Sequence, residues 1–163
     1  MAIRLSILLF LLLPAFTSFG VSDFAYFKIG DDVYFHSDIQ KINAQIKKVE
    51  CLFGETLISE ISKKNNLLPK DVILFRLKLI RYVKEINFEI ENKKLIEMVK
   101  KNLISCHISE DLFQKESVEK SMVVSELYFQ EYLLGADSNV EKSATFRRLS
   151  KLLDKRFVHF IYD

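Results

Sequence analysis

The chain has 163 residues, 49% of them hydrophobic and 28% charged, with 4 glycines and 2 prolines, which indicates a globular, helical protein and excludes a disordered or collagen-like one. Its formal net charge at pH 7 is +2, and without Arg4, the single charged residue among residues 1–22, 23 basic side chains stand against 22 acidic ones. Because this balance offers no bulk attraction to nucleic acid, we expect no nucleic-acid partner.

Residues 1–22 have the order of a secretory signal peptide. Arg4 comes first, an apolar run extends from Leu5 to Leu13, and Pro14 precedes small and polar residues. This run is shorter than the roughly 20 residues that a membrane-spanning helix needs. We therefore expect cleavage near residue 22, a periplasmic or secreted location, and no stable membrane insertion of the mature chain. An uncleaved anchor, lengthened by residues 16–21, is the alternative.

Residues 23–163 are long enough for a single domain with its own hydrophobic core. They begin with FAYFKIGDDVYF at 24–35, where aromatic and β-branched residues flank a turn formed by Gly30, Asp31 and Asp32. This pattern predicts a β-hairpin. Ser37 and Gln40 follow with the spacing of a capping box, which predicts a helix that begins at residue 37.

Helical patterns fill residues 37–134. Apolar residues spaced three and four apart predict helices over 37–50, over 54–64, from Pro69 onward, over 92–104, and from Ser109 to Leu134. The helix that Pro69 opens is apolar on most sides between Val72 and Val83. We expect this helix to be central, with the others packed around it.

The last 29 residues, 135–163, contain three different sequence patterns, which predict a loop, a helix and a strand in that order. GADSNVEKS at 135–143 predicts a loop, because Gly135 is typical of a helix end. A basic helix is predicted over 144–156, and the aromatic and β-branched residues 157–162 predict a strand that pairs with the opening hairpin. The expected fold class is mainly α, a helical bundle with a small antiparallel β-hairpin at the start joined by a C-terminal strand.

The two cysteines, Cys51 and Cys106, admit two interpretations. In an exported protein an even pair favours a disulfide, because the compartment is oxidising. The alternative is two buried thiols on neighbouring helices that behave as small apolar groups.

Catalytic chemistry has little support in the sequence. Cys106 and His107 are adjacent, and helical neighbours do not face each other, so they do not form a nucleophile and base pair. Neither cysteine has the second cysteine or spaced histidines of a zinc site. We expect no catalytic residue, no metal site and no cofactor. His36 and His159 fall on segments predicted to be close together, where a pH-sensitive contact or two unrelated histidines are both open.

Aromatic residues are the best candidates for binding. Most should belong to the core, but Tyr128, Phe129 and Tyr132 together cover too much of one helix for a single buried stripe. Some of them must therefore meet a second surface, of this protein or of a partner. With Phe113, these three residues are the candidate peptide-binding set.

The layout resembles the chaperone core of the SurA-like periplasmic folding factors. The similar segments are Ile29-Gly30-Asp31-Asp32-Val33 with Ser37-Asp38-Ile39, then Ile108-Ser109-Glu110-Asp111-Leu112-Phe113, and finally Leu153-Asp154-Lys155-Arg156-Phe157 running to Tyr162. Members of this family usually insert prolyl isomerase domains before the final helix, where this chain has only residues 135–143.

The resemblance implies an ATP-independent chaperone, without isomerase activity, that binds unfolded or outer-membrane polypeptides. A hypothesis from another class is an exported assembly subunit whose aromatic surfaces are covered by a partner or by a second copy in a homo-oligomer. An exported hydrolase would need a polar catalytic cluster that the sequence does not show.

Overall fold

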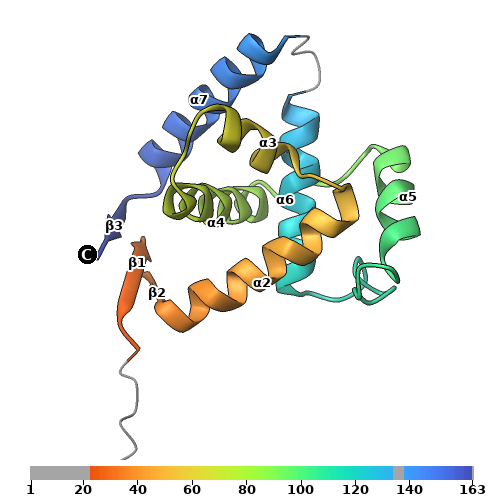
Figure 1. Ribbon diagram of the computed structural model, residues 1–163, viewed down its shortest axis with the longest axis horizontal. Coiled ribbons are helices and arrows are strands. Elements are labelled where there is room, and N and C mark those ends of the chain that lie inside the picture. Colours follow the sequence, from red (N-terminus) through yellow and green to blue (C-terminus); the bar gives the residue numbers. More distant parts are fainter. Residues whose placement is uncertain (1–22, 134–137, 163) are drawn as a thin grey trace, which may run out of the picture.

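The computed structural model describes residues 23–133 and 138–162. Within these ranges six helices pack together, and a small three-stranded antiparallel sheet lies at one end of the molecule (Figure 1). The helices are α2 (His36–Phe53), α3 (Leu57–Lys64), α4 (Pro69–Glu85), α5 (Lys93–Asn102), α6 (Val118–Tyr132) and α7 (Asn139–Arg156). The predicted fold class is confirmed. The predicted signal peptide lies outside the described residues.

The sheet joins the two ends of the described chain. Its strands are β1 (Ala25–Ile29), β2 (Asp32–Phe35) and β3 (His159–Ile161), in the order β2-β1-β3. Phe27 on β1 pairs with Tyr34 on one side and Ile161 on the other. Gly30 turns the hairpin at φ +59° and donates its N–H to the carbonyl of Val158 at 2.9 Å. The predicted hairpin and its pairing with the C-terminal strand are confirmed.

Helix α4 lies in the middle of the molecule, with α2, α3, α6 and α7 around it, as the sequence predicts (Figure 1). All seven residues from Ile73 to Leu79 are buried. Phe75 packs against Phe129 of α6 and Phe146 of α7, with ring centroids 5.8 and 4.6 Å away. This aromatic contact fixes α6 and α7 against the central helix.

A buried ion pair lies inside this packing. Arg76 of α4 contacts Glu126 of α6 at 3.5 Å, and its guanidinium donates to Thr56 Oγ1 at 2.6 Å. Glu126 also accepts the backbone N–H of Leu57, at the start of α3, at 2.7 Å. Burial raises the pKa of the Glu126 carboxyl, and the charge of Arg76 opposes that rise. The pair thus connects three helices.

Three predicted helix starts differ from the structure, and the first is that of α3, which begins at Leu57, after its capping residue Thr56, rather than at residue 54. Helix α2 begins at His36, and Asp38, rather than Gln40, accepts the backbone N–H of the capping residue, Phe35, at 3.1 Å. The Ser37 hydroxyl donates instead to Asp23. Helix α6 begins after Ser117, whose hydroxyl accepts the N–H of Lys120 at 3.0 Å, and not at Ser109, which forms a local turn with Asp111.

The start of the last helix is also corrected. Helix α7 begins at Asn139, inside the segment predicted as loop, because Ser138 and Glu141 form a capping box. Residues 134–137, including the predicted helix stop at Gly135, lie outside the described residues.

Cys51 and Cys106 form a disulfide, which confirms the first of the two interpretations. It joins the end of α2 to the turns after α5, across a sequence separation of 55 residues, with the two Cα atoms 5.7 Å apart. Among the helices and strands, the main packing partner of α5 is α2. The disulfide therefore anchors this outlying helix.

The C-terminal strand is held to α4 by a polar cluster. The buried Lys78 ammonium contacts Asp154 Oδ1 at 2.5 Å and His159 Nδ1 at 2.8 Å. Of the two outcomes left open for His36 and His159, the structure supports two unrelated histidines, because β3 and β2 are opposite edges of the sheet. His36 begins α2 and stacks on Phe24, with ring centroids 5.1 Å apart.

This cluster predicts a pH-dependent stability. Burial, and then the charge of Lys78, lowers the pKa of His159 below its usual value of about 6.5, although Asp154 opposes the shift. The unfolded chain therefore binds this proton first as the pH falls, so His159 lowers the stability progressively below about pH 6.5. Between pH 7.5 and pH 5.5 the melting temperature of the wild type should fall by more than that of H159Q, which thermal melts at the two pH values measure. Equal losses would contradict this assignment.

Candidate peptide-binding groove

An open groove runs between the C-terminal half of α4 and the N-terminal half of α6. Three adjoining cavities of about 430, 340 and 360 Å³ form it, from the side of β2 and α2 to the side of α5. The first and second share Ile80, Lys84, Glu116 and Ser121, and the second and third share Phe88, Lys120 and Val124. We call the three together the α4–α6 groove.

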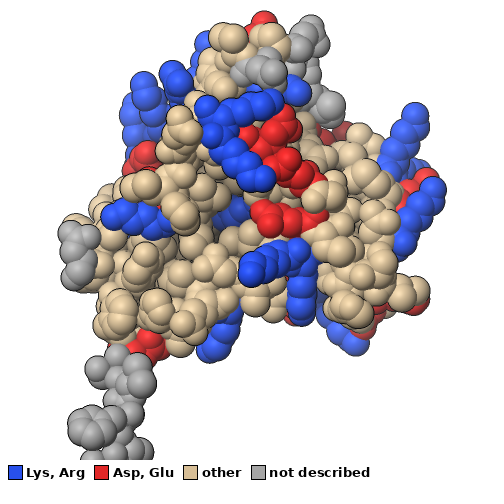
Figure 2. All heavy atoms as spheres, in the orientation of Figure 1, with Lys and Arg blue, Asp and Glu red and all other residues tan. Residues whose placement is uncertain are grey.

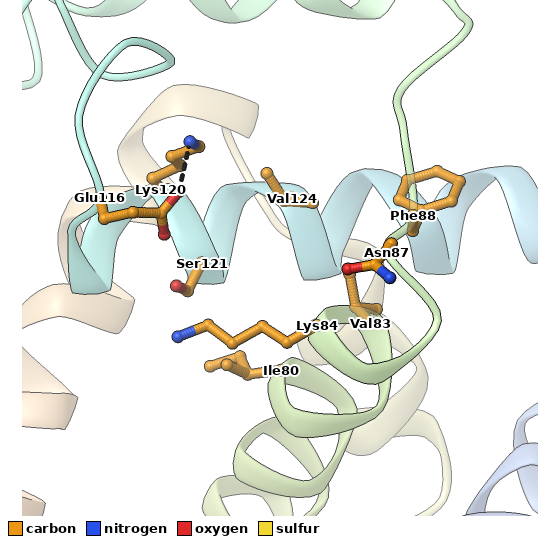
Figure 3. A pocket seen from close by; sticks show the side chains of 9 residues that line it. All are labelled: Ile80, Val83, Lys84, Asn87, Phe88, Glu116, Lys120, Ser121 and Val124. Atoms are coloured by element: carbon orange, nitrogen blue, oxygen red, sulfur yellow. Dashed lines mark hydrogen bonds and ion pairs between the residues drawn. The ribbon is translucent and has the colours of Figure 1, made fainter.

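The walls of the groove come from opposite helices. Figure 3 shows Ile80 and Val83 of α4 on one side and Val124 of α6 on the other, with Phe88 at one end. Because α4 is apolar on most of its circumference, it covers the core and still has apolar side chains left for this second surface. The result is an apolar surface that the protein itself leaves partly uncovered.

Charged side chains line the mouth of the groove. Lys120 pairs with Glu116 at 2.6 Å, as the dashed line in Figure 3 marks, and Lys84 extends toward α6 from the other wall. The hydrogen bond from Lys120, with its charge, lowers the pKa of the Glu116 carboxyl, and Lys84 adds to that effect. Both signs of charge are thus present at the rim at neutral pH.

The four predicted binding residues fall in different places. Phe113, half-buried, lines the end of the groove next to α5. Tyr128 lies at the border, where its ring contacts that of Phe88 at 5.0 Å, and Tyr132, 40% exposed, stacks on Tyr128. Phe129 is 0% exposed and belongs to the core. The structure therefore brings three of the four to one side and turns Phe129 inward.

An aromatic row continues from the groove toward α7. Tyr128 contacts Phe88 on one side and Tyr82 of α4 on the other, with ring centroids 5.0 and 5.9 Å away. Burial, and then the neighbouring Tyr82, raises the pKa of Tyr128, so that its hydroxyl stays protonated. We call Phe88, Tyr128 and Tyr82 the aromatic row.

Most of the groove-lining residues are not among the four predicted from the sequence. Ile80, which is partly exposed, and Val83, which is buried behind the groove, belong to a helix that the sequence predicts as core, and nothing in the pattern shows which of its apolar side chains stay uncovered. The available signal was the surplus itself, since an almost wholly apolar helix exceeds what one interface covers. Phe88 comes three residues after the end of α4, next to Asn87 at φ +49°, and lies at one end of the groove (Figure 3).

Other kinds of site have no support among the described residues. Residues 23–133 and 138–162 contain no group of three or more His, Cys, Asp or Glu side chains placed to hold a metal ion. None of the helices in that part of the chain is long and apolar enough to cross a membrane. Comparison with protein-family models, with curated proteins and with solved structures found no match. The SurA-like resemblance stays a hypothesis based on the residues quoted above.

Proposed function

We propose that this protein binds unfolded polypeptide segments in the α4–α6 groove, as an ATP-independent chaperone without isomerase activity. The observation that supports this most is the groove itself, three adjoining cavities with apolar walls that the chain leaves open. Exposed apolar surfaces of this kind are typical of interaction sites. Unfolded or outer-membrane polypeptides are the proposed clients.

The chemistry of the groove suits varied clients. Aliphatic walls made by Ile80, Val83 and Val124 contact side chains of any shape, because burial of apolar surface is not directional. Phe88 and Phe113 add large contact areas at low entropic cost. The rim has both Lys and Glu side chains, which can meet main-chain groups and charges of a client.

A location outside the cytoplasm accords with this function. The disulfide between Cys51 and Cys106 is consistent with an oxidising compartment, since cytosolic proteins rarely keep such bonds. Residues 1–22 have the pattern of a signal peptide. We propose a periplasmic or secreted protein.

A charge placed in the groove tests the proposed function. V124D puts a carboxylate in the apolar wall, while V140D puts the same group on α7, where Val140 is 79% exposed. We expect the wild type and V140D to slow aggregation of an unfolded β-barrel polypeptide at equimolar ratio. V124D should bind a labelled apolar peptide roughly tenfold more weakly, because the charge is desolvated on binding. Thermal melts establish that each variant is folded.

The proposal fails if the folded wild type neither slows aggregation nor binds the peptide. It also fails if V124D and V140D bind the peptide equally well. F88A, which removes a second wall residue without adding charge, provides an independent check of the same surface.

One observation favours the assembly-subunit alternative. On the outer face of the sheet, Val33 of β2 and Phe160 of β3 flank Lys28 of β1 in one cross-strand row and are 41% and 57% exposed. Phe35, 40% exposed, extends this apolar face. A second copy or another subunit would cover it. Light scattering that shows a stable oligomer, with no binding of an apolar dye, would favour this alternative.

A further inference from the structure

A second surface, separate from the α4–α6 groove, carries positive charge. A cleft of about 610 Å³ between α4 and α7 is lined by Tyr82, Arg148, Lys151, Leu152, Lys155 and Arg156. Figure 2 shows Lys and Arg side chains gathered over α7, at the upper left. We call this surface the basic cleft.

The charge of α7 differs from that of the chain as a whole. Its 18 residues, NVEKSATFRRLSKLLDKR, include six Lys or Arg and only two acidic residues, Glu141 and Asp154. The whole chain is almost neutral, with a formal net charge of +2. The positive electrostatic potential over α7 is therefore local. It would attract a ligand at short range, whereas the net charge of the whole protein would not.

The acidic side chains of residues 23–133 and 138–162 leave three of these cations unpaired. Among the described residues, Glu85 pairs with Arg156 at 2.7 Å and Asp154 pairs with the buried Lys78. Arg148, Lys151 and Lys155 are exposed and form no ion pair with another described residue.

The spacing of these cations places them together. Arg148, Lys151 and Lys155 are three and four residues apart, so they share one face of α7 over about 10 Å. Like charges at this spacing repel and destabilise the helix slightly. A ligand with several negative charges would relieve this repulsion.

The basic cleft is linked to the α4–α6 groove by the aromatic row. Tyr82 lines the cleft, Phe88 lines the groove, and Tyr128 contacts both rings. The guanidinium of Arg156 lies over the Tyr82 ring at 5.6 Å, and Leu152 is 41% exposed. Apolar contact area thus continues from the groove into the cationic surface.

We propose that the basic cleft binds acidic segments of the same polypeptide whose apolar side chains occupy the α4–α6 groove. This inference rests on the proposed function and adds a client class to it, chains in which an acidic stretch lies close to an apolar one. A single extended chain can follow the groove, the aromatic row and the cleft. This continuity with the apolar groove favours a polypeptide over an anionic lipid surface, which would need only the cations of α7.

Three peptides with one apolar sequence test the inference. Each carries an identical apolar part followed by a short block of Glu, of Gln or of Lys, and fluorescence anisotropy measures its binding to the full protein. The Glu peptide should bind roughly tenfold more tightly than the Gln peptide, the gain expected from three surface ion pairs of ordinary strength. That difference should shrink as salt rises from about 0.05 to 0.5 M.

Two matched triple variants test whether the preference for the Glu peptide arises at the basic cleft. R148Q/K151Q/K155Q should bind the Glu and Gln peptides alike and keep the wild-type affinity for the Gln peptide. K47Q/K93Q/K101Q removes the same net charge from exposed positions that line neither surface, and it should keep the preference for Glu. Loss of the preference in this control would overturn the assignment to the basic cleft.

The outcomes separate the two proposals. Equal binding of the Glu and Gln peptides by the wild type overturns the inference and leaves the proposed function standing. Failure of all three peptides to bind the folded protein overturns both. Sedimentation of the wild type, but not R148Q/K151Q/K155Q, with anionic phospholipid vesicles, without a preference for the Glu peptide, assigns the cleft to a lipid surface and overturns the inference.

Discussion

Replacement of both cysteines, in C51A/C106A, is expected to lower the free energy of unfolding by about 4 kcal/mol. The disulfide closes a loop with a sequence separation of 55 residues, and on the chain-entropy account a loop of this length restricts the unfolded state by about that amount. For a domain of this size the melting temperature should fall by roughly 10–15 °C. Differential scanning calorimetry of the variant and the wild type measures the change.

The reduced wild type is the matched control for this prediction. Cys106 is buried and Cys51 is exposed, so Ala at position 106 also removes a small packed side chain. Reduced wild-type protein keeps that side chain and should still lose most of the stability. If the oxidised and reduced proteins melt within about 2 °C of each other, the loop-closure argument does not hold for this chain.

The disulfide also helps to hold one end of the α4–α6 groove in place. The segment after Cys106 includes Phe113, which lines the end of the groove beside α5. Since α5 packs mainly on α2, loss of the bond should loosen this end of the groove before the rest of the molecule unfolds. A chaperone with this architecture would keep its full binding surface only where the bond persists.

The sheet and the central helix could be predicted from the sequence because each has a strong local residue pattern. Gly30 between two aromatic, β-branched runs indicates a hairpin, and residues 157–162 repeat that composition at the other end. The helix from Pro69 shows both an N-terminal proline and an almost continuous apolar run. The strand pairing followed because an isolated hairpin needs a third strand.

Helix starts were harder to predict because several polar residues compete as caps. Ser109 and Ser117 both precede helical patterns, but the Ser109 hydroxyl bonds to Asp111 in a local turn, and only Ser117 accepts a helix N–H. In the same way Ser37 bonds to Asp23, which is far from it in sequence. The bond of Ser37 depends on a contact that a local pattern does not contain, whereas at Ser109 two local hydrogen bonds compete.

The candidate surfaces depend on which side chains are left over after packing. Tyr128 and Phe129 are neighbours, and their side chains point about 100° apart on the helix. Phe129 is therefore buried in the core, while Tyr128 lies at the border of the groove. The sequence predicts this surplus of aromatic residues without showing which of them is buried. The basic character of α7 is equally plain in the sequence, but the pairing of Asp154 and Glu85 with other cations appears only in three dimensions.

The second large effect is expected at the buried ion pair. E126Q should lower the free energy of unfolding by about 3 kcal/mol, because the buried Arg76 guanidinium then loses its nearest countercharge and keeps only the weaker attraction of Glu50. The effect should reach three helices at once, since Glu126 on α6 also accepts the N–H that begins α3. Chemical denaturation monitored by circular dichroism measures the loss.

An apolar replacement of the whole pair separates this cause from simple loss of packing. In R76M/E126L neither position 76 nor position 126 carries a charge, so most of the stability lost in E126Q should return, as is common when buried ion pairs are replaced by side chains of similar volume. Arg76 also donates to Thr56 at 2.6 Å, and the double variant leaves that hydroxyl to its contact with Ser59. If E126Q is as stable as the wild type within about 0.5 kcal/mol, Glu126 does not offset the cost of burying the Arg76 charge, and the prediction is contradicted. If both variants are equally unstable, the three helices depend on the hydrogen bonds of this cluster rather than on its charges.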